Sequence, residues 1–143
     1  MFLPCMADGL NSFADLSRQF GSTAGNPVSA GMDTAYGYNL TETNFKYNGM
    51  DISVITEDVG ASTLVTKITI SRDSAFNSLE IPDILKLLSS SGDWTQKDDS
   101  NWTLSDSKVK ANWNGENKIF VTTDPSTIPP RVLPPRGTGS YGN

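Results

Sequence analysis

Residues 43–73, TNFKYNGMDISVITEDVGASTLVTKITISRD, decide the fold class, because they are typical of three consecutive β-strands. Phe45 and Tyr47 alternate with polar residues, which is the two-residue period of a half-buried strand. Asn48 and Gly49 follow, and both accept the positive φ angles that a type I′ hairpin turn requires. The sequence therefore predicts a tight hairpin centred on this pair.

Two more strands are predicted after this hairpin turn. Residues 50–54 alternate with their apolar side chains on one face, and Gly60 marks a second turn over residues 58–62. In the third strand, one face is expected to carry Leu64, Thr66, Ile68 and Ile70. Turns this short join antiparallel strands, because parallel neighbours need a crossover of about a dozen residues. We therefore expect an antiparallel meander.

A short amphipathic helix is predicted over residues 8–20. Asp8 is the expected N-cap, and Gly21 is the expected C-terminal stop. The apolar face contains Leu10, Phe13, Ala14 and Phe20, with Leu16 beside it. The pattern leaves open whether this face docks on the sheet of the same chain or on another subunit.

A second helix is predicted within residues 76–90, with a secure start at Pro82. Asn77 and Glu80 have the spacing of a capping box, and Gly92 is the expected end. Helical spacing connects Ile81, Ile84, Leu85 and Leu88. We expect this segment to be the main core helix.

A C-terminal hairpin is predicted around a turn at residues 114–117. The register of its last strand stays open, because a slip of one residue exchanges the two faces. A loop of two or four residues would place Phe120 on the face of Trp113. A loop of three residues would place Ile119 and Val121 there instead.

The chain divides into a core and two arms. We expect residues 1–41 to form a helix and an extended Gly/Ser-rich arm, residues 42–123 an α+β core domain, and residues 124–143 an extended Pro-rich tail. The predicted fold class is α+β: an antiparallel meander, one main core helix, a C-terminal hairpin and a short N-terminal helix. Residues 131–135 partly match an SH3-ligand core. The residues expected to contact partners are Tyr36, Tyr38, Pro129, Pro130, Arg131, Leu133, Pro134, Pro135 and Arg136.

Charge and hydropathy argue against two classes of partner. The net charge is −5, and the 11 Lys and Arg residues are scattered along the chain. Phosphate-binding surfaces need clustered cations, so we expect no direct contact with nucleic acid. No apolar run approaches the ~18 residues of a membrane span. We therefore expect no membrane span, and the first residues do not match a signal peptide.

The absence of histidine argues against most catalytic sites. It removes the Ser-His-Asp and Cys-His arrangements and the usual general base. Cys5 is the single cysteine, which leaves no cysteine metal cluster. Asp93, Asp98 and Asp99 do not follow the order of a calcium-binding EF-hand loop. We expect a protein that is not an enzyme and uses no cofactor.

Three tryptophans, Trp94, Trp102 and Trp113, lie within a short stretch of the chain. Tryptophan is an ordinary core and interface residue, and it also stacks on sugar rings when it is exposed. The sequence favours core positions for these residues. A carbohydrate- or ligand-binding module that uses them is the alternative.

These patterns together favour a structural or interaction subunit of a large assembly. We expect a bacteriophage virion protein, as a head decoration, neck or tail component, whose arms contact neighbouring subunits in a homo-oligomer or a hetero-assembly. The corresponding location is the virion. An acidic chaperone or inhibitor that binds another protein is a further alternative, because the sequence does not separate it from an assembly subunit.

Overall fold

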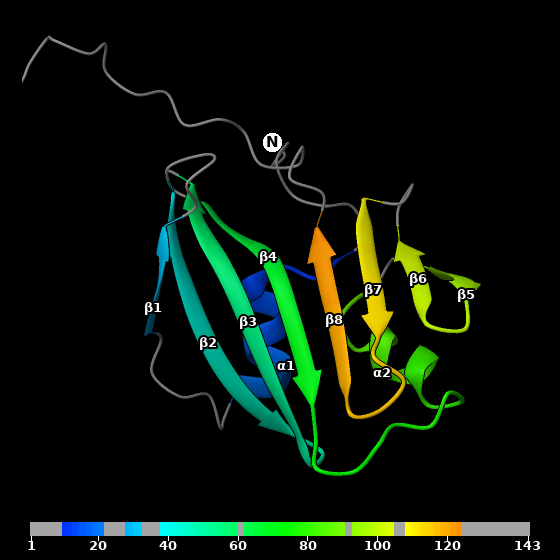
Figure 1. The fold of residues 1–143 in the computed structure, drawn as a ribbon. Coiled ribbons are helices and arrows are strands. Elements are labelled where there is room, and N and C mark those ends of the chain that lie inside the picture. Colours follow the sequence, from blue (N-terminus) through cyan, green and yellow to red (C-terminus); the bar gives the residue numbers. More distant parts are fainter. Residues whose placement is uncertain are drawn as a thin grey trace, which may run out of the picture.

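An eight-stranded antiparallel sheet with two short helices on one face makes up the fold (Figure 1). The computed structural model describes residues 10–21, 28–32, 38–59, 62–90, 93–104 and 108–123. The elements in chain order are α1 (Phe13–Phe20), β1 (Val28–Met32), β2 (Asn39–Tyr47), β3 (Met50–Val59), β4 (Ser62–Ser71), α2 (Ile81–Lys86), β5 (Trp94–Asp98), β6 (Asn101–Leu104), β7 (Val109–Trp113) and β8 (Lys118–Thr123). The predicted α+β class is confirmed in its broad form, with the sheet dominant. Among the described residues, no helix is long and apolar enough to cross a membrane.

The same arrangement of elements occurs twice along the chain. α1 precedes the meander β1–β4, and α2 precedes the meander β5–β8. The two meanders join through their last strands, since β4 pairs antiparallel with β8 and Thr69 lies opposite Phe120. The strand order β1-β2-β3-β4-β8-β7-β6-β5 is therefore approximately two-fold symmetric about an axis through the middle of the sheet. As a result, β1 and β5 hold equivalent positions at its two edges.

The predicted meander is confirmed. β2, β3 and β4 are consecutive antiparallel neighbours. Tyr47 pairs with Met50, so Asn48 and Gly49 form a two-residue loop with φ angles of 50° and 78°. Positive φ at both central positions is the property that a type I′ turn demands of its sequence.

The face expected for β4 is correct only in its second half. A register shift places Lys67 opposite Ile55 but Val65 opposite Thr56, so one residue of β4 is left over. This bulge exchanges the faces of the residues before it. Val65 therefore joins the core, while Leu64 lies on the face of its partner Glu57. Strict alternation does not reveal such a bulge.

One apolar core fills the space between the sheet and the two helices. Its buried members are Leu10, Leu16, Phe20, Phe45, Met50, Ile52, Val54, Val65, Ile68, Ile70, Phe76, Ile81, Ile84, Leu85, Leu88, Trp102, Leu104, Val109, Ala111, Ile119 and Val121. They come from both helices, from six of the strands and, for Leu10, Phe76 and Leu88, from connecting segments. The two halves of the chain therefore fold around a shared core.

α1 begins later than the sequence predicts. Ser12 is its N-cap, and the side-chain oxygen of Ser12 accepts a hydrogen bond from the backbone N–H of Asp15 at 3.2 Å. Asp8 lies outside the described residues. Phe20 packs against the rings of Phe45 and Tyr47, at centroid distances of 5.9 and 4.9 Å. The apolar face of α1 thus docks on the sheet of its own chain.

α2 is shorter than the predicted helix. It ends at Lys86, and the next backbone N–H groups, of Leu87 and Leu88, bond to carbonyls three residues earlier. This tighter pattern is common at the end of an α-helix. Ile81, Ile84 and Leu85 are buried under the sheet, as the spacing predicts.

The structure decides the register of the last hairpin. Trp113 pairs with Ile119, and Ala111 pairs with Val121. Five residues lie between Trp113 and Ile119. With this odd number, Ile119 and Val121 share a face with Trp113 and the buried Ala111, which is the core face. Phe120 is half-buried on the opposite face.

The segment 21–41 is more regular than expected. The sequence predicts an extended Gly/Ser-rich arm there, but β1 pairs with the first half of β2 and forms the edge of the sheet. Weak hydrophobicity hides this strand, because an exposed edge strand has no buried face to mark it. Residues 1–9, 22–27, 33–37 and 124–143 lie outside the described residues, and the predicted tail falls among them.

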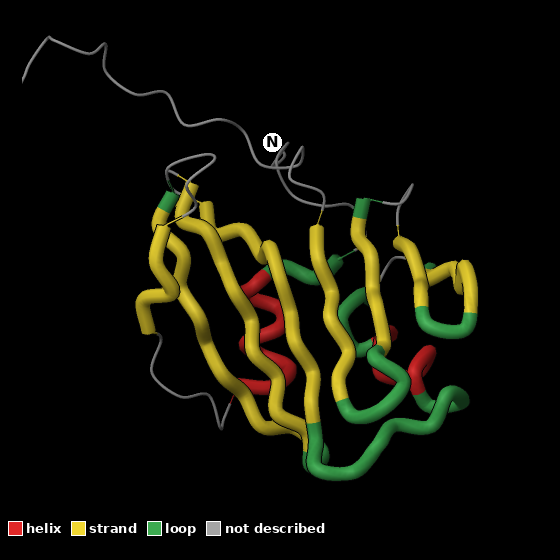
Figure 2. Tube along the Cα trace, in the orientation of Figure 1, coloured by secondary structure: helices red, strands yellow, loops and turns green. Residues whose placement is uncertain are grey.

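The connection from β4 to α2 passes beside the turn between β7 and β8 (Figure 2). The backbone N–H of Phe76 donates to the carbonyl of Glu116 at 2.7 Å. The side-chain amide of Asn117 donates to the carbonyl of Arg72 at 3.0 Å. These bonds tie the long connection to the second meander.

Candidate interaction surfaces

Of the residues predicted to contact partners, the structure describes only Tyr38. It immediately precedes β2 and is buried, with 7% of its surface exposed. Tyr36 lies outside the described residues, as do the seven predicted contact residues between Pro129 and Arg136. The interaction surfaces below therefore come from parts of the chain that sequence patterns do not single out.

The first surface is the β1 edge, which we define as strand β1, Val28–Met32. All five residues are exposed, and Val28 and Met32 keep 51% and 55% of their surface accessible. The strand, VSAGM, contains no charged residue and no proline. Charge and proline are the usual means by which edge strands avoid pairing with other chains. The β1 edge therefore presents an uncharged, partly apolar strand to solvent.

A bulge interrupts the pairing of β1 with β2. Ser29 pairs with Thr41 and Gly31 pairs with Leu40, which leaves Ala30 as the extra residue. Gly31 has a φ of 99°, a conformation that suits glycine. The bulge sharpens the local twist of β1, and the strand at the other edge, β5, carries a register shift as well.

The opposite edge, β5, differs in charge. Its sequence, WTQKD, ends in Lys97 and Asp98, and it also carries a register shift. The Asp98 carboxylate accepts from the backbone N–H of Ser100 and from the side-chain amide of Asn101, both at 2.9 Å. These hydrogen bonds stabilise the ionised carboxylate and so lower the pKa of Asp98. The bond from the Ser100 backbone has the largest effect. β5 is thus an edge guarded by charge.

The three tryptophans do not form one surface. Trp102 is buried, with 2% of its surface exposed, whereas Trp94 and Trp113 are half-buried against the core. The indole N–H of Trp94 donates to the carbonyl of Leu85, and that of Trp113 donates to the carbonyl of Glu116, both at 2.9 Å. The prediction that the tryptophans are core residues is therefore confirmed for Trp102, whereas Trp94 and Trp113 lie at the margin of the core. Trp94 also lines a pocket, which is described below.

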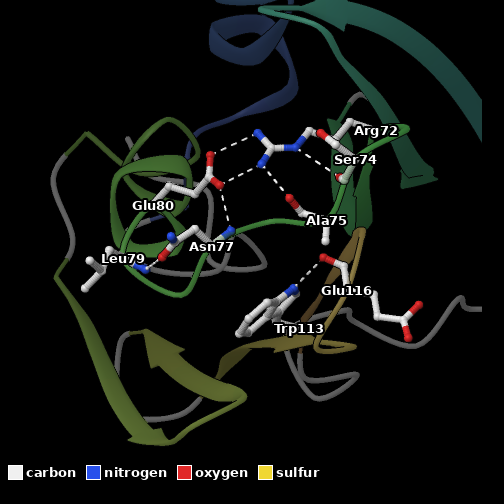
Figure 3. Close-up of polar contacts among 8 residues, drawn as sticks. All are labelled: Arg72, Ser74, Ala75, Asn77, Leu79, Glu80, Trp113 and Glu116. Carbon is white, nitrogen blue, oxygen red and sulfur yellow. Dashed lines mark hydrogen bonds and ion pairs between the residues drawn. The ribbon is translucent and has the colours of Figure 1, made fainter.

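A polar cluster around Arg72 and Glu80 closes the connection between β4 and α2 (Figure 3). The guanidinium donates to both carboxylate oxygens of Glu80, at 2.9 and 2.6 Å. It also donates to the carbonyls of Ser74 and Ala75, and it lies 4.2 Å from the ring centroid of Phe76. All three guanidinium nitrogens therefore donate hydrogen bonds to neighbouring residues.

The same cluster fixes the ionisation of Glu80. The hydrogen bonds from Arg72, and then the backbone N–H of Asn77 at 2.6 Å, lower the pKa of the Glu80 carboxyl. A carboxylate with a lowered pKa and committed oxygens is a poor general base. The capping-box spacing of Asn77 and Glu80 in the sequence predicts the hydrogen bond from the Asn77 backbone to the Glu80 carboxylate. No sequence motif marks Arg72 as the partner of Glu80. The two side chains meet only because the connection after β4 folds back toward the start of α2.

Within the described ranges, no three Asp, Glu, Cys or His side chains gather closely enough to hold a metal ion. Comparisons of the chain with protein families, with curated proteins and with solved structures found no match.

Proposed function

We propose that this protein is a non-enzymatic subunit that assembles with further copies of itself through the β1 edge. The observation that supports this proposal is the difference between the two sheet edges. β5 carries Lys97 and Asp98, whereas β1 is uncharged and exposes Val28 and Met32. An edge strand without charge or proline offers its free backbone N–H and C=O groups to another strand.

Pairing of two β1 strands would be symmetric. Most homo-oligomers form around two-fold axes, where the same patch meets itself. In an antiparallel pair centred near Ala30, Val28 of one copy would approach the end of the strand that carries Met32 in the other. The paired strands would not repel each other electrostatically, because β1 contains no charged residue. The contact would join two eight-stranded sheets into one continuous sheet.

The assembly that best suits this chain is a bacteriophage virion, with the protein as a head decoration, neck or tail component. Support comes from the sequence: a β-rich core is flanked by a Gly/Ser-rich segment and a Pro-rich tail, and histidine is absent. Arms of this composition can wrap neighbouring subunits and become ordered on them. The tail would then add contacts to those made by β1.

Lysine substitutions test the role of the β1 edge. We expect the wild-type protein to self-associate in sedimentation velocity runs at increasing concentration. The double variant V28K/M32K should remain monomeric, because the lysine at position 28 of one copy would lie opposite the lysine at position 32 of the other, and like charges oppose strand pairing. The matched control T95K places a lysine on the β5 edge and should associate like the wild type. A monomeric wild type, or a V28K/M32K variant that still associates, would contradict the proposal.

Truncation tests the contribution of the tail separately. Deleting residues 125–143 should leave the circular dichroism spectrum and melting temperature of the core unchanged but abolish assembly beyond the β1 contact. Deleting only residues 137–143 keeps both Pro-Pro-Arg repeats and should preserve assembly. Normal assembly by the longer truncation would exclude the tail as a contact arm.

A further inference from the structure

A pocket opens between α2 and the outer strands of the second meander. Its volume is about 280 Å³, and its lining residues are Pro82, Lys86, Asp93, Trp94, Gln96 and Trp102. Three elements contribute, since Pro82 and Lys86 belong to α2 and the tryptophans belong to β5 and β6. The pocket lies at the β5 side of the sheet and is separate from the β1 edge.

Trp94 gives this pocket a fixed aromatic wall. Its indole N–H is committed to the carbonyl of Leu85 at 2.9 Å, so the ring is held against the C-terminal half of α2. The ring is only half-buried, and its remaining surface is apolar. Trp102, with 2% exposure, is part of the core on which the pocket rests. A rigid aromatic surface of this kind can stack with little loss of side-chain freedom.

The polar residues around this wall offer both donors and acceptors. Lys86 and Asp93 carry opposite charges and are both exposed, so the lining has no net charge. Gln96 is also exposed, and its amide N–H donates to the carbonyl of Asp98 at 2.9 Å, which orients the side chain. A strongly charged ligand would meet one attractive and one repulsive group. A neutral ligand with several hydroxyls could bond to all three side chains.

We propose that this pocket binds a neutral sugar residue, stacked on Trp94 with its hydroxyls bonded to Lys86, Asp93 and Gln96. A sugar ring has one apolar C–H face and a rim of hydroxyls that donate and accept, which matches an aromatic wall with mixed polar groups. The pocket is slightly smaller than the ~300–1,000 Å³ typical of drug-sized ligands, so it suits one terminal sugar of a glycan. Trp113 does not line the pocket and is not part of the site.

Titration with neutral oligosaccharides tests this proposal on the full-length chain. The probes are trisaccharides of glucose, galactose, N-acetylglucosamine or rhamnose, followed by tryptophan fluorescence and by saturation-transfer NMR. We expect saturable binding of at least one probe, with a Kd of about 10 mM or tighter. W94A should weaken binding at least about tenfold, W94F should retain part of it, and W113F should bind like the wild type.

Two further measurements, on polar-residue variants and on competing ligands, make the test decisive. Q96A and K86A alter exposed residues, so they should fold normally, and each should weaken binding of the same probe several-fold. Inorganic phosphate and an unrelated uncharged peptide should not compete. The proposal is overturned if no neutral trisaccharide binds saturably, or if binding survives unchanged in W94A, Q96A and K86A. Loss of self-association in V28K/M32K would leave this binding intact, so the two proposals fail independently.

Discussion

Asn11 and Ser90, far apart in sequence, are hydrogen-bonded to each other. The side-chain oxygen of Asn11 accepts from both the backbone N–H and the hydroxyl of Ser90, each at 3.0 Å. The backbone N–H of Asn11 donates to the carbonyl of Leu88 at 2.8 Å. These bonds join the residue before the N-cap of α1 to the segment that follows α2, so they link the helical regions of the two halves on the covered face of the sheet.

Replacing Asn11 with alanine tests this link. The variant N11A loses both side-chain hydrogen bonds to Ser90, and we expect it to lower the free energy of unfolding by about 1–2 kcal/mol. Urea denaturation followed by tryptophan fluorescence gives the value. The matched control is N44A, which alters an exposed asparagine in β2 and should change stability by less than about 0.5 kcal/mol. Equal effects of the two variants would mean that the Asn11 contact is not stabilising.

Acidification should weaken the Arg72–Glu80 pair. The pKa of Glu80 is lowered in the folded protein from its ordinary value of 4.5, so the unfolded state takes up a proton first as the pH falls. The stabilisation is therefore complete above about pH 5 and is lost as the pH falls through the folded pKa. E80Q should be less stable than the wild type at pH 7 but lose less stability between pH 7 and about pH 3.

Urea midpoints at several pH values measure this difference. Glu80 is partly exposed, so solvent screening keeps its effect modest. The control E116Q, in the exposed turn between β7 and β8, should keep the pH dependence of the wild type. If E80Q and the wild type decline in parallel, the ion pair does not contribute to acid sensitivity.

Two glycine-to-alanine changes should have opposite effects. Both Gly49 and Gly21 have open space where a Cβ would lie. Gly49 has a φ of 78°, so G49A should cost about 1 kcal/mol through backbone strain in the hairpin turn. Gly21 has a φ of −69°, so G21A should be neutral or stabilise by about 0.4–1 kcal/mol by restricting the unfolded chain. Melting temperatures of the two variants suffice, and a stabilising G49A would contradict the turn geometry.

Two leucines near α2 should differ sharply in their tolerance of alanine. Leu85 is fully buried, and L85A should lower the free energy of unfolding by about 2–5 kcal/mol through lost burial and a residual cavity. Leu79 is 83% exposed, and L79A should change it by less than about 0.5 kcal/mol. Chemical denaturation compares them directly. A large effect of L79A in a monomeric sample would contradict the assigned exposure.

Local patterns were sufficient for much of the sheet. Asn48 and Gly49 predicted the hairpin because a type I′ turn restricts which residues fit its φ angles. Alternation predicted β2 and β3, since one face of each is buried. The bulge turns Val65 toward the helix-covered core and Leu64, which is also buried, to the opposite face. Alternation does not predict this, because a bulge changes register without a mark in the hydrophobic pattern. Alternation does not predict β1, because every position of this strand is exposed.

By itself, then, the sequence determined those features whose physical cause is local: turn conformation, strand period and the apolar spacing of the second helix. Tertiary structure decided the features that depend on distant partners. β8 lies beside β4, Asn11 meets Ser90, Arg72 meets Glu80, and Trp94 lines a pocket while Trp102 is buried. The difference between the edges β1 and β5 belongs to this second group. Charge can be read along the chain, but it marks an edge strand only after the pairing of the other strands has fixed where the sheet ends.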